Sequence, residues 1–449
     1  MVFTPHTSAE VEAMLKTIGA DSIEALFEAI PRQEREADFS ALPTARSEMD
    51  VAAECRRLAG QNRGVHHYRS FLGAGAYEHF TPAAVDHILR RGEFFTAYTP
   101  YQAEASQGTL QAIYEYQSMI CALAALEVAN ASLYDGASAA AEAVILAVRQ
   151  TERKRVAVAR GLHPASRRVI ETYTRYLGVE LVELPFAEGV TDVDTLSQKG
   201  LQSNLAAVVV AQPNAFGCIE PVETIARASH QGGALCIAVV NPLSLGILKP
   251  PGEWGADIAV GDGQPLGIPL SFGGPYVGFM SLRKSLARRM PGRLVGRTLD
   301  RNGKSGFVLT LQTREQHIRR ERATSNICTN QALCALAVTL YLSLVGKEGL
   351  RKVALLNLDR SHYLFERATA IEGISAAWKR PFFNEFVLRL PASAEGVVRR
   401  MRKRGFLAGW PLTRWSKKWD KNWLLVCATE TKSKRDCDEY VNALGQAGK

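Results

Sequence analysis

Residues 206–239 read AAVVVAQPNAFGCIEPVETIARASHQGGALCIAV, and this stretch decides the fold. Its two ends, Ala206 to Val210 and Ala234 to Val239, are short apolar runs of the kind that forms buried strands. Between them, Val222 to Gln231 is predicted to form a helix. A strand, a helix and a second strand in succession indicate a parallel sheet that is covered on both faces.

The same alternation continues on both sides of this stretch. It predicts strands at Arg155 to Ala159, Glu180 to Leu184 and Asp257 to Val260, and helices at Ala137 to Gln150 and Arg167 to Leu177. An amphipathic helix is predicted from Thr109. Asn302-Gly303, between Leu299 and Phe307, is typical of a hairpin turn. We therefore expect an α/β protein with a mostly parallel sheet.

Three parts are expected along the chain. Residues 1–65 begin with a capping box at Thr7 to Glu10 and a second short helix from Ser22, and they resemble a helical arm more than a self-sufficient domain. Residues 66–329 form the large α/β domain. Residues 330–449 form a smaller α+β domain that opens with a long helix from Asn330, with strands at Glu385 to Leu390 and Leu424 to Ala428 and helices at about 395–404 and 432–444.

Composition bounds the class of protein. The 449 residues are 47% hydrophobic and 22% charged, which is ordinary for a globular protein. Met1 to His6 lack a basic and an apolar region, so no secretory signal is expected. The longest apolar run, Ala332 to Val345, is too short to span a bilayer. Eight scattered cysteines without a C-x-x-C pair favour a reducing cytoplasm and argue against a metal site.

Phe94 to Gly108 is the segment richest in hydrogen-bonding side chains. It reads FFTAYTPYQAEASQG, and Pro100 and Gly108 punctuate it. Because it has neither helical nor strand periodicity, we predict an ordered loop. Such loops line functional sites on a rigid scaffold, although a well-packed connector has the same composition.

Longer motifs identify a relationship. These are FLGAGAY (71–77), TAYTPYQAEASQGTLQAIYEYQ (96–117), NASLYDGA (130–137), Gln212-Pro213-Asn214, PLSFGGPYVG (269–278), TLQTREQHIRRERATSNICTNQ (310–331) and Leu424 to Thr429. With them the chain resembles the glycine cleavage system P-protein family over nearly its whole length. The resemblance is to the branch that holds subunit 1 of glycine dehydrogenase (decarboxylating), from organisms that split P-protein into two chains.

The resemblance implies a fold-type I pyridoxal-phosphate transferase fold and a place in a heteromeric complex. The partner, subunit 2, would carry pyridoxal phosphate on a lysine, in an αβ or α2β2 assembly. There glycine would form an external aldimine and lose CO2, and the aminomethyl group would pass to the lipoyl group of H-protein. Neither nucleic acid nor a membrane is expected as a partner.

The cofactor lysine of this fold is missing from the chain. After Gly255-Ala256-Asp257, Gln264 or Pro265 falls where the catalytic subunit has its lysine, and neither forms a Schiff base. Lys249, Lys284 and Lys304 are poor substitutes by position. The strand that ends at Val239-Val240-Asn241 also lacks the aspartate that relatives place against the pyridine nitrogen.

A possible remnant of the phosphate site is Asp135-Gly136-Ala137-Ser138, which resembles the turn that cradles phosphate. A turn of this composition also serves close packing of a helix on a sheet. It is therefore no evidence of cofactor binding. We expect no cofactor on this chain and no catalytic residue of its own.

The site residues that the chain would contribute to its partner's active site lie in the 94–108 segment. They are Tyr98, Tyr101 and Gln102, with Thr99 and Ser106 behind them, because hydroxyl and amide groups suit the orientation of a carboxylate or the lining of a lipoyl channel. Asn326, Thr329 and Asn330 are weaker candidates, and they could instead cap the helix that follows.

Two other functions remain open at this point. One is an autonomous pyridoxal-phosphate aminotransferase or lyase, which the missing lysine opposes. The other is nucleic-acid binding through residues 399–421, where nine Lys/Arg stand against Asp420 and where Trp410, Trp415 and Trp419 lie, with Trp423 just beyond. The same segment would also suit a basic surface over packed tryptophans, or the docking of an acidic protein.

Overall fold

The structure is a computed structural model that describes residues 6–35, 38–65, 67–196 and 204–448. It divides into two compact units, Met1–Gly64 and Val65–Lys449. Residues 1–5, which carry most of the expectation about a secretory signal, lie outside the described residues, as does His66, where the large domain is expected to begin.

The first unit consists of short helices that form no buried core among their described residues. They are α1 (Ser8–Ile18), the 3-10 turn η1 (Glu24–Phe27), α2 (Arg32–Arg35) and α3 (Glu48–Ala59), and none of their described residues is buried. The predicted capping box at Thr7 is confirmed, with reciprocal hydrogen bonds to Glu10. The helix predicted from Ser22 is wrong, because only one 3-10 turn forms there.

The second unit is built on a sheet of seven strands in the order β2-β10-β9-β8-β7-β3-β4. The five strands from β9 to β4 are parallel, whereas β10 runs antiparallel to both of its neighbours. Five of these strands were predicted and are confirmed within a few residues: β3 (Arg155–Ala159), β4 (Glu180–Leu184), β7 (Leu205–Gln212), β8 (Leu235–Val240) and β9 (Ile258–Asp262). The other two, β2 (Val128–Ala129) and β10 (Gly278–Leu282), were not predicted.

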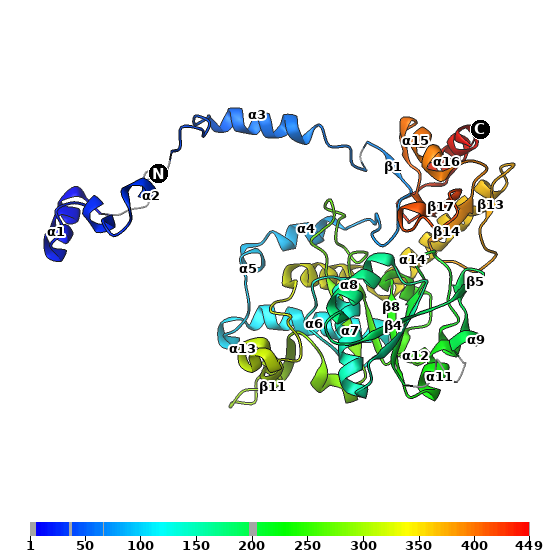
Figure 1. Ribbon diagram of the computed structural model, residues 1–449, viewed down its shortest axis with the longest axis horizontal. Coiled ribbons are helices and arrows are strands. Elements are labelled where there is room, and N and C mark those ends of the chain that lie inside the picture. Colours follow the sequence, from blue (N-terminus) through cyan, green and yellow to red (C-terminus); the bar gives the residue numbers. More distant parts are fainter. Residues whose placement is uncertain (1–5, 36–37, 66, 197–203, 449) are drawn as a thin grey trace. The chain divides into compact units, whose positions relative to one another are not determined.

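Helices cover both faces of this sheet, as the alternation predicts. One face packs against α7 (Gly136–Thr151) and α8 (Pro164–Thr174), which lie side by side over the strands (Figure 1). The other face packs against α6 (Gln107–Ala124), α11 (Val222–Gln231) and the first part of α14 (Ala332–Thr369). Each face therefore encloses its own apolar core, and the carboxyl ends of the parallel strands meet at one edge.

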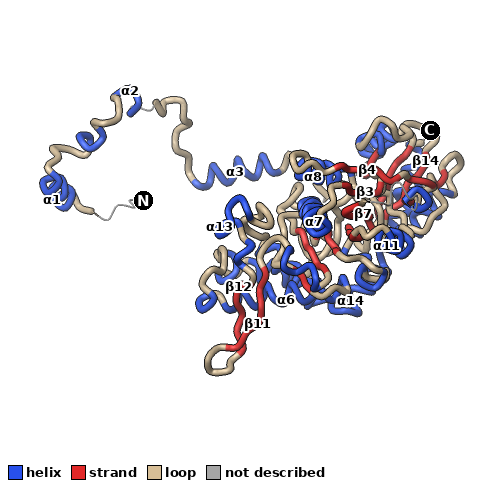
Figure 2. The backbone as a smooth tube through the Cα atoms, turned by 60° about the horizontal axis from the view of Figure 1, so that its bottom comes forward, coloured by secondary structure: helices blue, strands red, loops and turns tan. Residues whose placement is uncertain are grey.

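Smaller elements surround the sheet. The short ones are β1 (Arg69–Ser70), α4 (Ala83–Leu89), α5 (Gly92–Phe95), β5 (Phe186–Ala187), β6 (Val190–Thr191), α9 (Val193–Leu196), α12 (Pro251–Trp254) and α13 (Gln316–Arg319), with 3-10 turns η2 (Ala103–Ala105), η3 (Pro242–Gly246), η4 (Lys284–Arg289), η5 (Gln312–Arg314) and η6 (Arg320–Arg322). The predicted hairpin is confirmed as β11 (Leu294–Leu299) and β12 (Ser305–Thr310), which projects from the unit (Figure 2).

The C-terminal region is a four-stranded antiparallel sheet with helices on it. Its strand order is β13-β14-β17-β16, and its core also contains residues of α14, α15 and α16. The elements are β13 (Ser375–Ala376), β14 (Glu385–Arg389), α15 (Ala394–Lys403), β15 (Phe406–Leu407), β16 (Trp410–Pro411), η7 (Leu412–Arg414), β17 (Trp423–Cys427) and α16 (Lys434–Ala447).

Among the described residues, α14 is the one helix long and apolar enough by composition to cross a membrane. Its backbone leaves helical geometry at Gly346 (φ 60°, ψ −176°), so two helices meet there. The apolar part before this kink, residues 332–345, spans only about 21 Å, which is less than the hydrocarbon core of a bilayer. Ala335, Val338 and Tyr341 of this part are buried in the protein core.

The segment 94–108 contains more regular secondary structure than predicted. Phe94 and Phe95 end the short helix α5, η2 forms at Ala103–Ala105, and α6 already begins at Gln107. The prediction of a continuous loop is therefore wrong at both ends. Isolated turns of this length lack the periodicity that a sequence pattern needs.

Candidate functional site

A cavity of about 330 Å³ lies at the carboxyl ends of β7, β8 and β9. We call it the strand-end cavity. It is enclosed by the ends of these strands, by the first turn of α7, by the loop 74–77 and by Glu385 of β14. Open parallel sheets bind their ligands at this edge, so this is where the cofactor of the fold is expected.

Gln264 is one of the two residues expected at the lysine position, and its side chain is hydrogen-bonded to the surrounding backbone; Pro265, the other, lines the cavity. Its Oε1 accepts a hydrogen bond from Tyr77 N (2.9 Å), and its Nε2 donates to Tyr77 O (2.8 Å) and to Ile268 O (2.9 Å). The side chain is almost fully buried, at 1% exposed. Gln264 therefore fastens the loop 74–77 to the turn after β9, and both N–H groups of its amide are bonded within the chain.

Asp262 occupies the phosphate cradle at the start of α7. Its carboxylate accepts hydrogen bonds from Gly136 N (3.0 Å) and from Gln264 N (2.9 Å), while Asp135 accepts from Ser138 N (2.7 Å). Burial raises the pKa of Asp262 to about 6, against backbone hydrogen bonds that lower it. The helix N-terminus that would attract a phosphate is thus already capped by two carboxylates of the chain itself.

Glu385 closes the cavity from the C-terminal region. Its Oε1 accepts a hydrogen bond from Ala74 N (2.6 Å), and its Oε2 accepts one from Tyr77 OH (2.7 Å). Burial raises the pKa of Glu385 to about 7, whereas these two hydrogen bonds lower it. Gly73 is required beside this carboxyl, because a Cβ there would collide with it.

These residues do not fit pyridoxal phosphate. Among the described residues that line the strand-end cavity, none is Lys or Arg, and Asp135, Asp262 and Glu385 are acidic. Val239, Val240 and Asn241 line the cavity at the end of β8, where the family resemblance leads us to expect the acid for the ring nitrogen, and none of them carries a carboxyl group. Lys249 is exposed and pairs with Glu223 (2.7 Å), and Lys284 and Lys304 are exposed as well. The cavity thus lacks the lysine, the ring acid and a free phosphate cradle.

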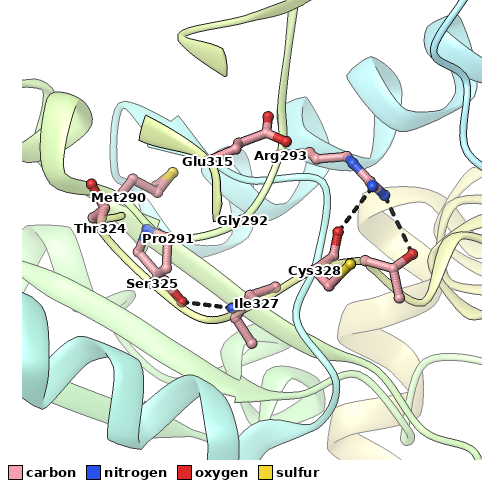
Figure 3. Close-up of a pocket in the computed structure, with 10 residues that line it drawn as sticks. Met290, Pro291, Gly292, Arg293, Glu315, Thr324, Ser325, Ile327 and Cys328 are labelled. Carbon is pink, nitrogen blue, oxygen red and sulfur yellow. Dashed lines mark hydrogen bonds between the residues drawn. The ribbon is translucent and has the colours of Figure 1, made fainter. Parts of the chain in front are cut away.

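A second polar group of residues surrounds Arg293, at the start of β11 (Figure 3). Arg293 is 5% exposed. Its guanidinium donates to four neutral oxygens, those of Tyr101 OH, the Cys328 carbonyl, Thr329 Oγ1 and Asn330 Oδ1. It also lies over the ring of Tyr101, 5.5 Å from the centroid. We call these five residues the Arg293 cluster.

The structure brings only one of the five predicted site residues into this cluster. Tyr101 joins it, whereas Tyr98 is 80% exposed and Gln102 is exposed. Thr99 is half-buried, and Ser106 precedes α6 without a side-chain capping bond. Their contribution to a partner's site stays a prediction.

The weaker candidates behave differently from their expected capping role. Gln331 is the N-cap of α14, and it makes no side-chain capping bond. Thr329 and Asn330 instead bind Arg293, and Asn330 Nδ2 donates to Ala131 O (3.0 Å). Asn326 is exposed. The capping alternative is therefore wrong, because tertiary contacts claim these side chains.

The tryptophans of the basic segment pack against one another. Trp410, Trp415, Trp419 and Trp423 belong to one cluster with Phe186, Phe216 and Trp378. Trp419 also carries Arg160 over its ring (4.8 Å), and Trp410 carries Arg414 (5.0 Å). Rings held in this way are not a free platform for stacking bases. The exposed basic residues of α15 remain as a charged surface.

Comparison with known proteins decides the family. The model of the glycine cleavage system P-protein family matches residues 1–444. The chain belongs to this family. Its resemblance to subunit 1, drawn from the sequence motifs, is confirmed by relatives matched over the full length.

Two of these P-protein relatives carry the same printed name, probable glycine dehydrogenase (decarboxylating) subunit 1. The protein of Desulfitobacterium hafniense is 49% identical over 446 residues, covering 99% of this chain and 100% of the relative. The protein of Carboxydothermus hydrogenoformans is 50% identical over 445 residues, covering 99% of each chain.

A solved structure agrees with this assignment to the P-protein family. The crystal structure of glycine decarboxylase (P-protein) of the glycine cleavage system, in inhibitor-bound form, matches with a TM-score of 0.91 at 46% identity, covering 100% of both chains. A sphingosine-1-phosphate lyase of Burkholderia pseudomallei matches with a TM-score of 0.64 at 16% identity, covering 93% of this chain and 94% of its own. The latter shows the fold alone, and the predicted fold-type I class is confirmed.

Sequence reasoning missed Arg293, Asp262 and Glu385. Arg293 ends a basic run that starts at Arg283, and such runs are usually solvated. The sequence held one signal that Arg293 could be buried, since the apolar residues Leu294 and Val295 follow it. Both of these residues are buried in the structure. Asp262 and Glu385 had no comparable signal, since their partners are distant in sequence.

Proposed function

We propose that this chain is the non-catalytic subunit of a two-chain glycine dehydrogenase (decarboxylating). Its partner subunit carries pyridoxal phosphate, and the complex decarboxylates glycine and passes the aminomethyl group to the lipoyl group of H-protein. The single observation that carries this division of labour is the strand-end cavity, whose described lining holds no Lys or Arg and where Asp262 already accepts a hydrogen bond from Gly136 N at the start of α7.

The names of the relatives support the complex. They are called subunit 1, and the solved structure is a glycine decarboxylase of the glycine cleavage system. Sites of this fold lie at subunit boundaries, and symmetric assemblies favour α2β2 over αβ. In such an assembly the exposed phenols Tyr98 and Tyr101 would be available to complete the partner's site.

The role of this surface can be tested in the assembled complex. Tyr98→Phe and Tyr101→Phe remove one hydroxyl each and keep the ring. We expect slower glycine–bicarbonate exchange and slower aminomethyl transfer, by about 3- to 30-fold, because one hydrogen bond to a charged group is lost. Tyr176→Phe is a matched control, since Tyr176 is 90% exposed and lies after α8. Unchanged rates in both variants would rule out these residues as site components.

The two other functions have less support. An autonomous pyridoxal-phosphate enzyme needs a lysine in the cavity, and none of the described residues lining it is one. Nucleic-acid binding needs free aromatic faces, whereas the four tryptophans pack in one apolar cluster.

A further inference from the structure

Arg293 is a buried cation without an anion. It is 95% buried, and within the described ranges no carboxylate lies at ion-pair distance from it; its partners are neutral oxygens. A buried charge that lacks an opposite charge is strongly unfavourable. Such a group either destabilises the fold or binds a ligand that supplies the opposite charge.

The hydrogen bonds that Arg293 makes are weak replacements for an ion pair. Nη2 donates to the Cys328 carbonyl at 2.9 Å, but its distance to Tyr101 OH is 3.4 Å. Nη1 lies 3.3 Å from both Thr329 Oγ1 and Asn330 Oδ1. Three of the four distances exceed the usual range for N–H···O bonds. The guanidinium is therefore held loosely by side chains that another acceptor can displace.

The hydroxyl groups around Arg293 also lack hydrogen-bond acceptors for their protons. Tyr101 and Thr329 each accept a hydrogen bond from the guanidinium, which leaves the proton of each hydroxyl free to donate. Neither hydroxyl donates to an acceptor in the part of the chain that the structure describes. Two O–H donors and one cation thus lie side by side, and what they lack is negatively charged oxygen.

The acid that lines the same small cavity as Arg293 does not meet this need. Glu315 and Arg293 line one small cavity, and Glu315 Oε1 and Arg293 Nε are both buried there without a partner (Figure 3). The cavity measures about 10 Å³. That is room for about one water molecule, and the two groups form no ion pair. Glu315 instead lies 3.6 Å from His317 Nδ1.

We propose that Arg293, Tyr101 and Thr329 form a receptor for a carboxylate that comes from outside this chain. The planar guanidinium matches a carboxylate, and the two hydroxyls supply further donors. Access is open, because Tyr101 is 62% exposed and Cys328 is exposed. The receptor rests on the proposed function, in which two carboxylates can arrive with the partner subunit: that of the substrate glycine, or an Asp or Glu side chain of the partner.

Arg293→Gln in the assembled complex distinguishes these sources. If the receptor takes glycine, its KM in the glycine–bicarbonate exchange rises about 10- to 100-fold. Inhibition by methylamine, which has no carboxylate, then stays unchanged. If the receptor takes a partner side chain, the dissociation constant between the subunits rises by a similar factor while the KM for glycine stays constant. Changes below about twofold in both constants would overturn the proposal.

Arg297→Gln is the matched control. Arg297 lies four residues further along β11, is exposed and binds Ser305 Oγ, so neither constant should change. Thr329→Val and Tyr101→Phe keep the cation and remove one free proton each. They should raise the constant that Arg293→Gln raises, which is either the KM for glycine or the dissociation constant between the subunits, by about three- to tenfold. These variants decide the case if Arg293→Gln fails to fold.

Failure of the proposed function would look different. In that case the wild-type complex would exchange no carboxyl group. Two measurements that need no turnover then test the receptor. They are the dissociation constant of glycine from the complex, measured by calorimetry, and the dissociation constant between the subunits. Weaker glycine binding or weaker assembly in Arg293→Gln supports it, and equal values for both in wild type and variant overturn it.

Discussion

The strand-end cavity and the Arg293 cluster are both rich in polar side chains, but they differ in how completely those groups are bonded. Around the cavity, Gln264, Asp262 and Glu385 find their partners within the chain, whereas His163 Nε2 is buried in the described lining without one. In the Arg293 cluster, the guanidinium has only neutral acceptors, and the hydroxyl protons of Tyr101 and Thr329 have no acceptor among the described residues. The difference teaches that the cavity expected from the fold and the region with free hydrogen-bond donors need not coincide.

The largest expected effect concerns the bonding of Gln264. Gln264→Ala should lower the free energy of unfolding by about 4 kcal/mol, because one buried and two partly buried hydrogen bonds are lost and Tyr77 N and O are left without these partners. Urea unfolding of the isolated chain measures this loss.

Gln107→Ala sharpens the comparison. Gln107 holds Phe307 N and O and Ala103 O in the same three-bond pattern, but it is exposed. Water replaces its bonds, so we expect a loss below about 1 kcal/mol. Equal losses in the two variants would show that the cavity is not sealed from water.

The next effect is a dependence of stability on pH. Since burial raises the pKa of Glu385 from 4.5 to about 7, the folded state holds this proton more tightly than the unfolded state does. The contribution is fully present below pH 4.5 and is lost as the pH rises through 7. The stability of the wild type relative to Glu385→Gln should therefore fall by up to about 3 kcal/mol over this range.

Glu395→Gln provides the opposite sign. The side-chain hydrogen bond from Arg414 lowers the pKa of Glu395, so its contribution is present above pH 4.5 and is lost as the pH falls through the folded-state value. Because this carboxylate is largely exposed, the change should be small. If the free energies of unfolding of the wild type and of Glu385→Gln changed with pH in parallel, Glu385 would not titrate in this range.

The smallest effect is expected in the Arg293 cluster. Thr329→Val should change the free energy of unfolding by less than about 1 kcal/mol, because the lost hydroxyl proton has no acceptor and Asn330 still binds the guanidinium. Thermal unfolding of the isolated chain measures it. A loss as large as that of Gln264→Ala would make Thr329 a structural residue and erase the contrast between the two sites.

Much of the fold was predictable from the sequence, but little of the site was. Strands such as Arg155–Ala159 follow from apolar runs that are buried on both faces. Gln264 was found because a family motif marks its position, yet its three bonds to Tyr77 and Ile268 depend on the folded chain. Arg293 has the sequence signature of a solvated residue, and only tertiary packing buries it.

Cofactor content tests the central claim most directly. Pyridoxal phosphate would be measured per chain in this protein alone and in its complex with the partner subunit. The account predicts none on the isolated chain, and one per heterodimer in a complex that decarboxylates glycine. A stoichiometric, reducible aldimine on the isolated chain would contradict it, because a lysine would then have to reach a cavity whose described lining holds none.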